Sequence, residues 1–543
     1  MLGTDREGEP MSLKARSKAA LIAGIALVAA AAYTASTGSA GQAPDTLVVD
    51  RSFEIRTSDP QRAFEPTASI VNRGVYDTLL TFKGADVSKP VLLAARGYRA
   101  SRDAKTYTFD LRRDIRFADG TPMTAADVVF SFRRLINLKG NPSFLLAGVT
   151  VSARGTHTVV LRSKTPNTAI PAIVANTSLG IVNSKLARAH GATDRAGADK
   201  TDKAEKWFNS AASRGAGSGP YVLREYSTTS RIVLDQNAQF WGRKPAFERV
   251  VVRNMGAPTQ FINIQRGRHE VAIDLSAQQA QSLQRNNRLR VKTQPSTWVF
   301  WLFANNNPAI SDATSNKRFQ AAVRSALDYP SFVRLAGGGA IQARGIIPSM
   351  FLGSLPRSAA VTRNLGRARS ELAASGVGGQ TFTLEFPSDL TINGVAFTTL
   401  AQRVQANLQE AGFQVELAGA PVGTWLDKYR SGKMAFGLSL WGPDYPDPAD
   451  YLAFMPGELV GLRVGWKKGS DATLERVAAR ARVTTSDAAR APLYRQIQNR
   501  LNSSGPYFPL IQPTQVFAAT SDLQGAVFNP LYSIDVRLPR PAS

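Results

Sequence analysis

The chain has 543 residues, of which 43% are hydrophobic, and it carries a formal net charge of +25 with three histidines and no cysteine. A chain of this length can bury a large core and divide into two or three domains, and without cysteine it cannot rely on disulfides. No run of five basic residues occurs, which argues against a nucleic-acid-binding arm. We relate the positive charge to an anionic envelope or to the working pH.

The N-terminal segment has the three parts of a secretory signal. Three basic residues follow Met11, residues 19–32 form an uncharged apolar run, and residues 33–43 are rich in small residues. The apolar run is short for a membrane span. Residues 1–43 are therefore predicted to be a signal peptide and leader, with an uncleaved membrane anchor as the alternative. Because no cysteine is present to carry a lipid, we expect the exported protein to be free in the periplasm.

Strand-like and helix-like patterns alternate along the rest of the chain, which favours an α/β class. Residues 107–111 alternate apolar and polar side chains, as a half-buried strand does. Thr124 and Asp127 have the spacing of a capping box before a helical stripe over 128–136. The other predicted elements are a helix from Pro258 to Gly267, a strand over 271–273, a helical stripe over 319–327 and a strand over 413–417.

Composition changes suggest where domains meet. Residues 187–219 are rich in Ala, Gly, Ser and charge, and we interpret them as a surface connection. Further changes fall at 291–307 and at 503–509.

Catalytic and metal-binding patterns are largely missing. The three histidines have no neighbouring acidic or histidine ligand at metal spacing, so no metal site or cofactor is predicted. Gly215 to Gly219 matches neither the dinucleotide fingerprint nor the Gly-x-Ser-x-Gly elbow. A hydrolase would require a nucleophile and a base that meet only in space.

The most informative segment is the Asp444 loop, residues 440–448, which reads LWGPDYPDP. Asp444 lies between two large aromatic residues, Trp441 and Tyr445, in a backbone stiffened by prolines. A carboxylate held between aromatic walls suits a charged amine whose remainder is apolar. The alternative is a Pro-rich turn in which the Asp caps a neighbouring backbone group.

Several segments occur in a recognisable order along the mature chain. The clearest is FADGTPMTAADVVFS at 117–131. The others are 92–94 with 107–109, 217–221, 237–245, 265–274, 303–305, 323–328 and 441–448. This ordered set resembles the extracellular solute-binding proteins of family 5, the oligopeptide-, dipeptide- and nickel-binding components of ABC importers.

The resemblance implies an α/β, type II-like periplasmic-binding-protein fold, with two lobes around a cleft. The first lobe would cover 44–290, with a small extra domain inserted at about 66–185. The second lobe would cover 291–508, and residues 509–543 would return to complete the first. Ligand binding would close the lobes, and the closed form would dock on a permease driven by ATPase subunits.

The resemblance also implies ligand-binding residues. In oligopeptide-binding relatives the α-amino group of the peptide pairs with an Asp that corresponds to Asp444, so Asp444 is the expected amine partner. Trp441 is the expected pocket wall and Tyr445 its neighbour.

A weaker similarity places Glu54 and Ile55 at the cleft. It covers residues 52–60, which resemble the segment after the first strand. The alternative for Glu54 is a solvated loop acid. Ser58 and Pro443 depart from the family pattern, which leaves the class of ligand more open than the fold, because relatives bind peptides, nickel complexes, opines, haem or sugars.

Together these features predict the substrate-binding component of an ABC importer, which captures peptides or peptide-like amines without chemistry. We expect a monomer with no cofactor, metal ion or nucleic-acid partner. It would meet the membrane only through its permease or an uncleaved signal. The alternatives are a sensory or envelope-interaction binding protein without a transporter and a secreted hydrolase.

Overall fold

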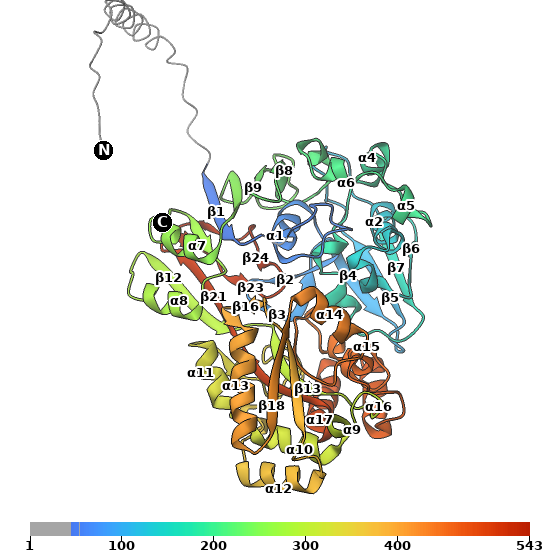
Figure 1. The fold of residues 1–543 in the computed structure, drawn as a ribbon. Helices are drawn as coiled ribbons and strands as arrows, with labels where there is room; N and C mark the ends of the chain where they lie inside the picture. The colour runs from blue at the N-terminus through green and yellow to red at the C-terminus, as the bar shows by residue number, and fades with distance from the viewer. Residues whose placement is uncertain (1–44, 54, 543) are drawn as a thin grey trace, which may run out of the picture. The chain divides into compact units, whose positions relative to one another are not determined.

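A computed structural model describes residues 45–53 and 55–542 of the chain. The predicted signal peptide, residues 1–43, lies outside the described residues, and so does Glu54. From Thr46 onward the fold is built on two large mixed sheets and one smaller sheet (Figure 1).

The first large sheet has seven strands. In spatial order they are β12 (Leu289–Pro295), β21 (Thr514–Thr520), β11 (Glu270–Ala272), β1 (Thr46–Arg51), β10 (Arg249–Asn254), β9 (Arg231–Gln236) and β8 (Tyr221–Tyr226). The central strand β1 runs parallel to both of its neighbours, β10 and β11, and the remaining pairs are antiparallel. The predicted strand over 271–273 lies at β11.

The second large sheet has six strands. In spatial order they are β14 (Ile341–Gln342), β20 (Tyr507–Gln512), β13 (Val299–Ala304), β19 (Phe436–Trp441), β15 (Thr381–Pro387) and β18 (Gln414–Ala420). Every residue of β13 and β20 is buried, because helices and the neighbouring domain cover both faces of the sheet. The predicted strand over 413–417 is β18.

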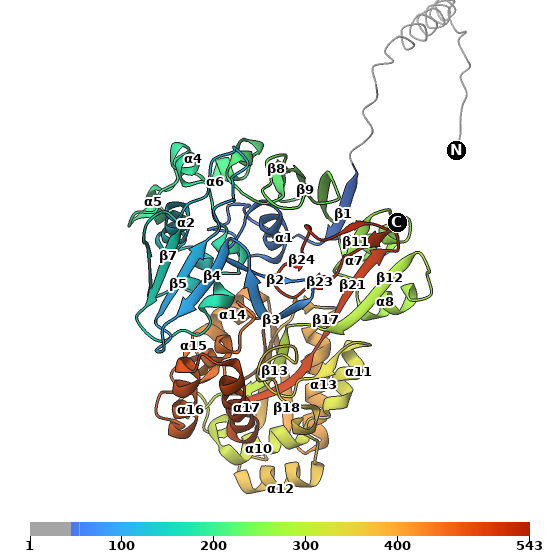
Figure 2. The same cartoon turned by 180° about the vertical axis from the view of Figure 1, so that it is seen from behind.

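The chain passes between the two large sheets twice, at adjacent points. Residues 296–298 connect β12 to β13, and Pro513 connects β20 to β21 (Figure 2). The backbone N–H of Ser296 donates to the carbonyl of Pro513 at 2.8 Å, and the Gln512 side chain donates to the Ser296 carbonyl at 2.8 Å. Both connections follow soon after the boundaries expected at 291 and 509, and those boundaries stay predictions.

A third, four-stranded sheet is built from residues of the predicted inserted domain. Its order is β4 (Ala95–Ala100), β5 (Thr106–Leu111), β7 (Thr158–Ser163) and β6 (Val149–Ala153). Helix α2 (Ala125–Leu138) lies between β5 and β6 in the chain and starts at the predicted capping box, where the Thr124 hydroxyl donates to the Asp127 carboxylate at 2.8 Å. Strand β5 alternates buried and half-buried residues, as the sequence pattern predicts.

Helices cover the sheets, and none of those in the described part of the chain is long and apolar enough to cross a membrane. The helix predicted from Pro258 to Gly267 is α7 (Ala257–Ile264), which ends before Gly267. The helical stripe predicted over 319–327 is α10 (Lys317–Ala326). Besides α2 the helices are α1 (Pro66–Val75), α3 (Ile170–Ile173), α4 (Ser184–Ala189), α5 (Ala198–Thr201), α6 (Glu205–Phe208), α7 (Ala257–Ile264), α8 (Ala277–Leu283), α9 (Asp312–Ser315), α10 (Lys317–Ala326), α11 (Tyr329–Ala336), α12 (Leu365–Ser375), α13 (Phe397–Glu410), α14 (Val422–Arg430), α15 (Leu459–Arg463), α16 (Ala472–Val483) and α17 (Asp487–Ser504).

Residues 187–219 are not a surface connection, so that interpretation was wrong. The segment forms short helices, and Phe208 and Ala216 are fully buried in the core beside the first sheet. A Cβ atom at Gly217 would lie 2.1 Å from the carbonyl oxygen of Val75. The small residues that suggested a loop instead allow close packing of backbone against backbone.

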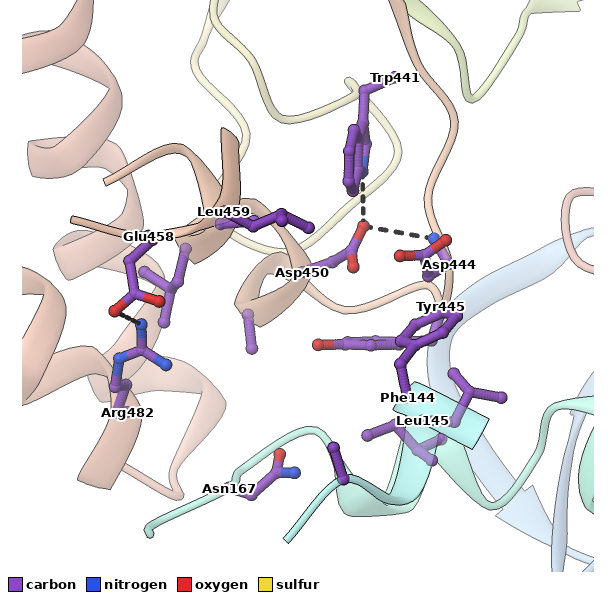
Figure 3. A pocket seen from close by; sticks show the side chains of 15 residues that line it. Phe144, Leu145, Asn167, Trp441, Asp444, Tyr445, Asp450, Glu458, Leu459 and Arg482 are labelled. Atoms are coloured by element: carbon purple, nitrogen blue, oxygen red, sulfur yellow. Dashed lines mark hydrogen bonds and ion pairs between the residues drawn. The ribbon is translucent and has the colours of Figure 1, made fainter. Parts of the chain in front are cut away.

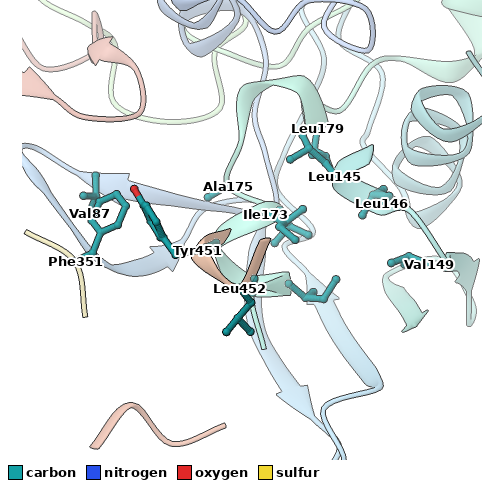
Figure 4. Close-up of a cluster of buried hydrophobic side chains, with 14 of the residues drawn as sticks. Val87, Leu145, Leu146, Val149, Ile173, Ala175, Leu179, Phe351, Tyr451 and Leu452 are labelled. Carbon is teal, nitrogen blue, oxygen red and sulfur yellow. The ribbon is translucent and has the colours of Figure 1, made fainter. Parts of the chain in front are cut away.

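The largest apolar cluster joins the four-stranded sheet to the second large sheet. Phe109 and Leu161 contribute from the small sheet, and Trp301 contributes from β13. Figure 4 shows Tyr451 and Leu452, which follow β19 in sequence, among side chains of the inserted segment. This packing holds the end of β19 against the inserted domain, where the candidate site lies.

Candidate functional site

A cavity of about 240 Å³ lies beside the Asp444 loop, between the second large sheet and the inserted domain (Figure 3). Its walls come from three parts of the chain. The Asp444 loop and the turn after it supply Trp441, Asp444, Tyr445, Ala449, Asp450, Leu452 and Ala453, the inserted domain supplies Phe144, Leu145, Ala147, Asn167 and Ile173, and the α15–α16 region supplies Glu458, Leu459 and Arg482.

The sequence dictates why the loop begins where it does. Strand β19 pairs with β13 as far as Trp441. Prolines then follow at 443, 446 and 448, and they cannot donate ladder hydrogen bonds, so the strand stops. Pro448 instead opens a short 3₁₀ helix, Pro448–Phe454, and the Asp447 side chain caps it by accepting from the Ala449 N–H at 2.8 Å.

Two contacts hold the loop in place. Arg490 of α17 forms a two-pronged ion pair with Asp447, at 2.9 and 2.5 Å. The side-chain amide of Asn176, which follows α3, donates to the backbone carbonyl of Asp444 at 3.2 Å. Asp447 is therefore neutralised within the protein, and Asp444 is held by its backbone with its carboxylate left free for other contacts.

Asp444 presents a carboxylate without a counter-ion. Within residues 45–53 and 55–542 the Asp444 carboxylate accepts no hydrogen bond and has no cationic nitrogen within 4 Å. Burial raises its pKa to about 7, and the positive charge of Arg463 opposes that rise. A partly buried, unpaired carboxylate that lines a cavity is suited to pairing with a cation.

A second carboxylate, Asp450, lies next to it and was missed by the sequence analysis. Its side chain is 6% exposed, and one oxygen accepts hydrogen bonds from the indole of Trp441 at 2.8 Å and from the Asp444 N–H at 3.3 Å (Figure 3). Burial raises its pKa well above the usual value, and the negative charge of Asp444 raises it further. The chain direction in the 3₁₀ helix brings it back to the cavity, which sequence spacing alone does not reveal.

The structure places the other predicted residues as follows. Trp441 and Tyr445 both line the cavity, and the Trp441 ring also packs edge-on against Phe454 with centroids 5.7 Å apart. Ile55 does not line this cavity, because its side chain is 8% exposed and belongs to the apolar cluster of the first sheet.

The far side of the cavity carries an ion pair and an apolar rim. Glu458 accepts from Arg482 at 2.7 Å, across the cavity from Asp444 in Figure 3. Phe144 and Leu459 line the cavity and are also exposed. The site thus offers negative charge at one end and apolar surface at its mouth. In the described part of the chain, no three acidic or histidine side chains are grouped to hold a metal ion.

The two large sheets and their helices form a two-lobed α/β fold. The family model of bacterial extracellular solute-binding proteins, family 5 (middle region), matches residues 89–458, and the chain belongs to this family. The expected fold class is confirmed by solved structures of the same architecture.

Among curated relatives, the probable D,D-dipeptide-binding periplasmic protein DdpA of Escherichia coli K12 is 26% identical over 90% of this chain and 92% of its own length. The periplasmic oligopeptide-binding protein OppA of Salmonella typhimurium is 23% identical over 91% and 92%.

Among solved structures, HbpA2 from Haemophilus parasuis superposes with a TM-score of 0.78 at 19% identity, covering 92% of this chain and all of its own. The periplasmic binding protein DppA from Helicobacter pylori, in complex with the peptide STSA, gives 0.72 at 19% identity, covering 92% and 98%. DdpA, OppA and DppA are binding proteins by their names.

Proposed function

We propose that this protein is the substrate-binding component of an ABC importer, and that the cavity beside the Asp444 loop captures the free amino end of a peptide or peptide-like amine. One observation carries the proposal: the Asp444 carboxylate lines a cavity and has no counter-ion among the described residues. An ammonium group would supply the missing charge, and the aromatic walls would cover the apolar remainder of the ligand.

The proposed mechanism is capture without chemistry. Ligand binding closes the two lobes about the paired connections at 296–298 and Pro513, and the closed protein delivers its ligand to a membrane permease. Export by the predicted signal would place the protein in the periplasm, where it acts as a monomer. The names of the relatives, which bind dipeptides and oligopeptides, support this choice of ligand.

The test is native mass spectrometry of the gently purified protein, followed by identification of any released ligand. We expect co-purified peptides with free amino ends, and we expect Asp444→Ala to lose them. Asp427→Ala is the matched control, because Asp427 lies exposed on α14 away from the cavity. A non-peptide ligand would overturn the choice of substrate. Equal retention by Asp444→Ala would overturn the site, and cleavage of added peptides by the pure protein would overturn capture without chemistry.

A further inference from the structure

We propose that Asp450 is a second ligand-facing carboxylate, and that the site prefers peptides whose N-terminal residue carries a second positive charge. Such ligands include short peptides that begin with a diamino acid such as ornithine or lysine. This inference rests on the proposed function of the cavity and specifies its class of substrate.

The geometry leaves one oxygen of Asp450 for a ligand. The Trp441 indole and the Asp444 N–H both donate to the same oxygen, Oδ2, at 2.8 and 3.3 Å. These bonds fix the orientation of the carboxyl group, and Asp450 lines the cavity together with Asp444. Two carboxylates therefore meet at one end of the same small cavity.

No positive charge of the described residues neutralises this pair. Arg490 is engaged by Asp447, and Arg463 lies over the ring of Tyr429, 5.4 Å from its centroid. Neither Asp444 nor Asp450 has a cationic nitrogen within 4 Å in the parts of the chain that the structure describes. The inserted-domain wall adds no titratable group. The charged and titratable groups around the pair are Asp447, Arg490, Arg463, Tyr445, Tyr451 and Tyr494, with Glu458 and Arg482 at the far side.

Charge balance then separates two kinds of ligand. Burial and the charge of Asp444 raise the pKa of Asp450, so the empty site favours a proton on this carboxyl group over a second negative charge. A ligand with one ammonium pairs with Asp444. A ligand with a second ammonium also favours the ionised form of Asp450, so any proton held there passes to the buffer and a second ion pair forms.

Isothermal titration calorimetry with two matched dipeptides tests the proposal. Ornithyl-alanine and norleucyl-alanine have N-terminal side chains of similar size, but only ornithine carries the second ammonium. Titration near pH 8 in two buffers of different ionisation enthalpy counts the protons released. We expect ornithyl-alanine to bind about tenfold or more tightly and to release more protons than norleucyl-alanine.

Variants assign the effect to Asp450. Asp450→Asn keeps an oxygen that can accept from Trp441 and is expected to abolish both differences while norleucyl-alanine still binds. Asp427→Asn is expected to keep both. A folded Asp450→Asn protein that retains the preference for ornithine overturns the proposal.

Comparing the two dipeptides on the wild-type protein gives a result that does not depend on whether a variant folds. Binding of both dipeptides with equal affinity and equal proton release overturns this inference and leaves the proposed function standing. If neither these dipeptides nor a pool of free-amino peptides binds, the proposed function fails and this inference fails with it.

Discussion

Two groups of buried carboxylates in this protein are neutralised in opposite ways. Asp59 and Asp202 share Arg134 of α2, whose guanidinium lies 2.6 Å from Asp59 and 2.7 Å from Asp202, and all three side chains are 0% exposed. Asp444 and Asp450 have no comparable partner among the described residues. In the first group both carboxylates are paired with Arg134, and these ion pairs join α2 to the segment after β1. The second leaves its charge for a ligand, and this difference separates a structural network from a binding site.

The largest expected effect comes from breaking the complete network. Arg134→Met leaves the buried carboxylates of Asp59 and Asp202 with Arg62 alone, at 3.5 and 3.2 Å, and we expect the free energy of unfolding to fall by about 3–5 kcal/mol. Urea denaturation measures it, with the exposed Arg154→Met as the control. A loss below about 1 kcal/mol would show that the network is not the structural element described here.

Removing the charge of Asp444 is expected to keep or raise the stability of the protein and to weaken ligand binding strongly. Asp444→Asn should weaken binding of a free-amino peptide by about 2–5 kcal/mol, because it leaves the ligand ammonium without its partner. Without ligand, the same variant should be at least as stable as the wild type near pH 8, since it removes an unpaired carboxylate. Calorimetry and urea denaturation give the two values. A variant that is clearly less stable than wild type would place Asp444 among the structural carboxylates.

Acidity is a second way to remove the charge of Asp444. The pKa of about 7 means that this carboxyl takes up a proton as pH falls through 7. Affinity for a monoamine peptide should therefore fall below pH 7, by up to about tenfold per pH unit. The empty protein shows the reverse trend: because the folded pKa is raised, the Asp444 contribution to stability declines as pH rises from about 4 to about 7. If the affinity does not change between about pH 5 and pH 8, the result contradicts a carboxylate–ammonium pair.

The smallest expected effect concerns the hydrogen bond between Asn176 and the backbone of the Asp444 loop. Asn176→Ala removes the hydrogen bond to the Asp444 carbonyl, and we expect affinity to fall by about 1 kcal/mol with all charges unchanged. The effect should be the same at every pH, unlike that of Asp444→Asn. A pH-dependent loss in Asn176→Ala would mean that Asn176 acts through the carboxylate rather than through the loop backbone.

Local patterns in the sequence predicted local structure well. Thr124 and Asp127 marked the start of α2 because a capping box involves neighbouring residues alone. Asp444 stood out because aromatic residues and prolines surround it in sequence. Residues 187–219 were misread, since the same small residues that suit a loop also allow the close approach of Gly217 to Val75.

The rest of the site depends on tertiary structure. Asn176 reaches the Asp444 loop from a distant part of the chain, and no spacing rule links the two. Asp450 reads as one more acid in a polar turn until the 3₁₀ helix returns it to the cavity. That Asp444 has no counter-ion among the described residues becomes visible only when the neighbouring side chains are placed.

Binding of one peptide with and without its charge tests the central claim most directly. Norleucyl-alanine and its N-acetylated form differ in the ammonium group, and calorimetry near pH 8 compares their affinities for the wild-type protein. We predict that acetylation reduces affinity by about a hundredfold or more, and that Asp444→Asn removes most of this difference. Equal binding of the two forms would contradict the account, because the Asp444 carboxylate would then have no ammonium to recognise.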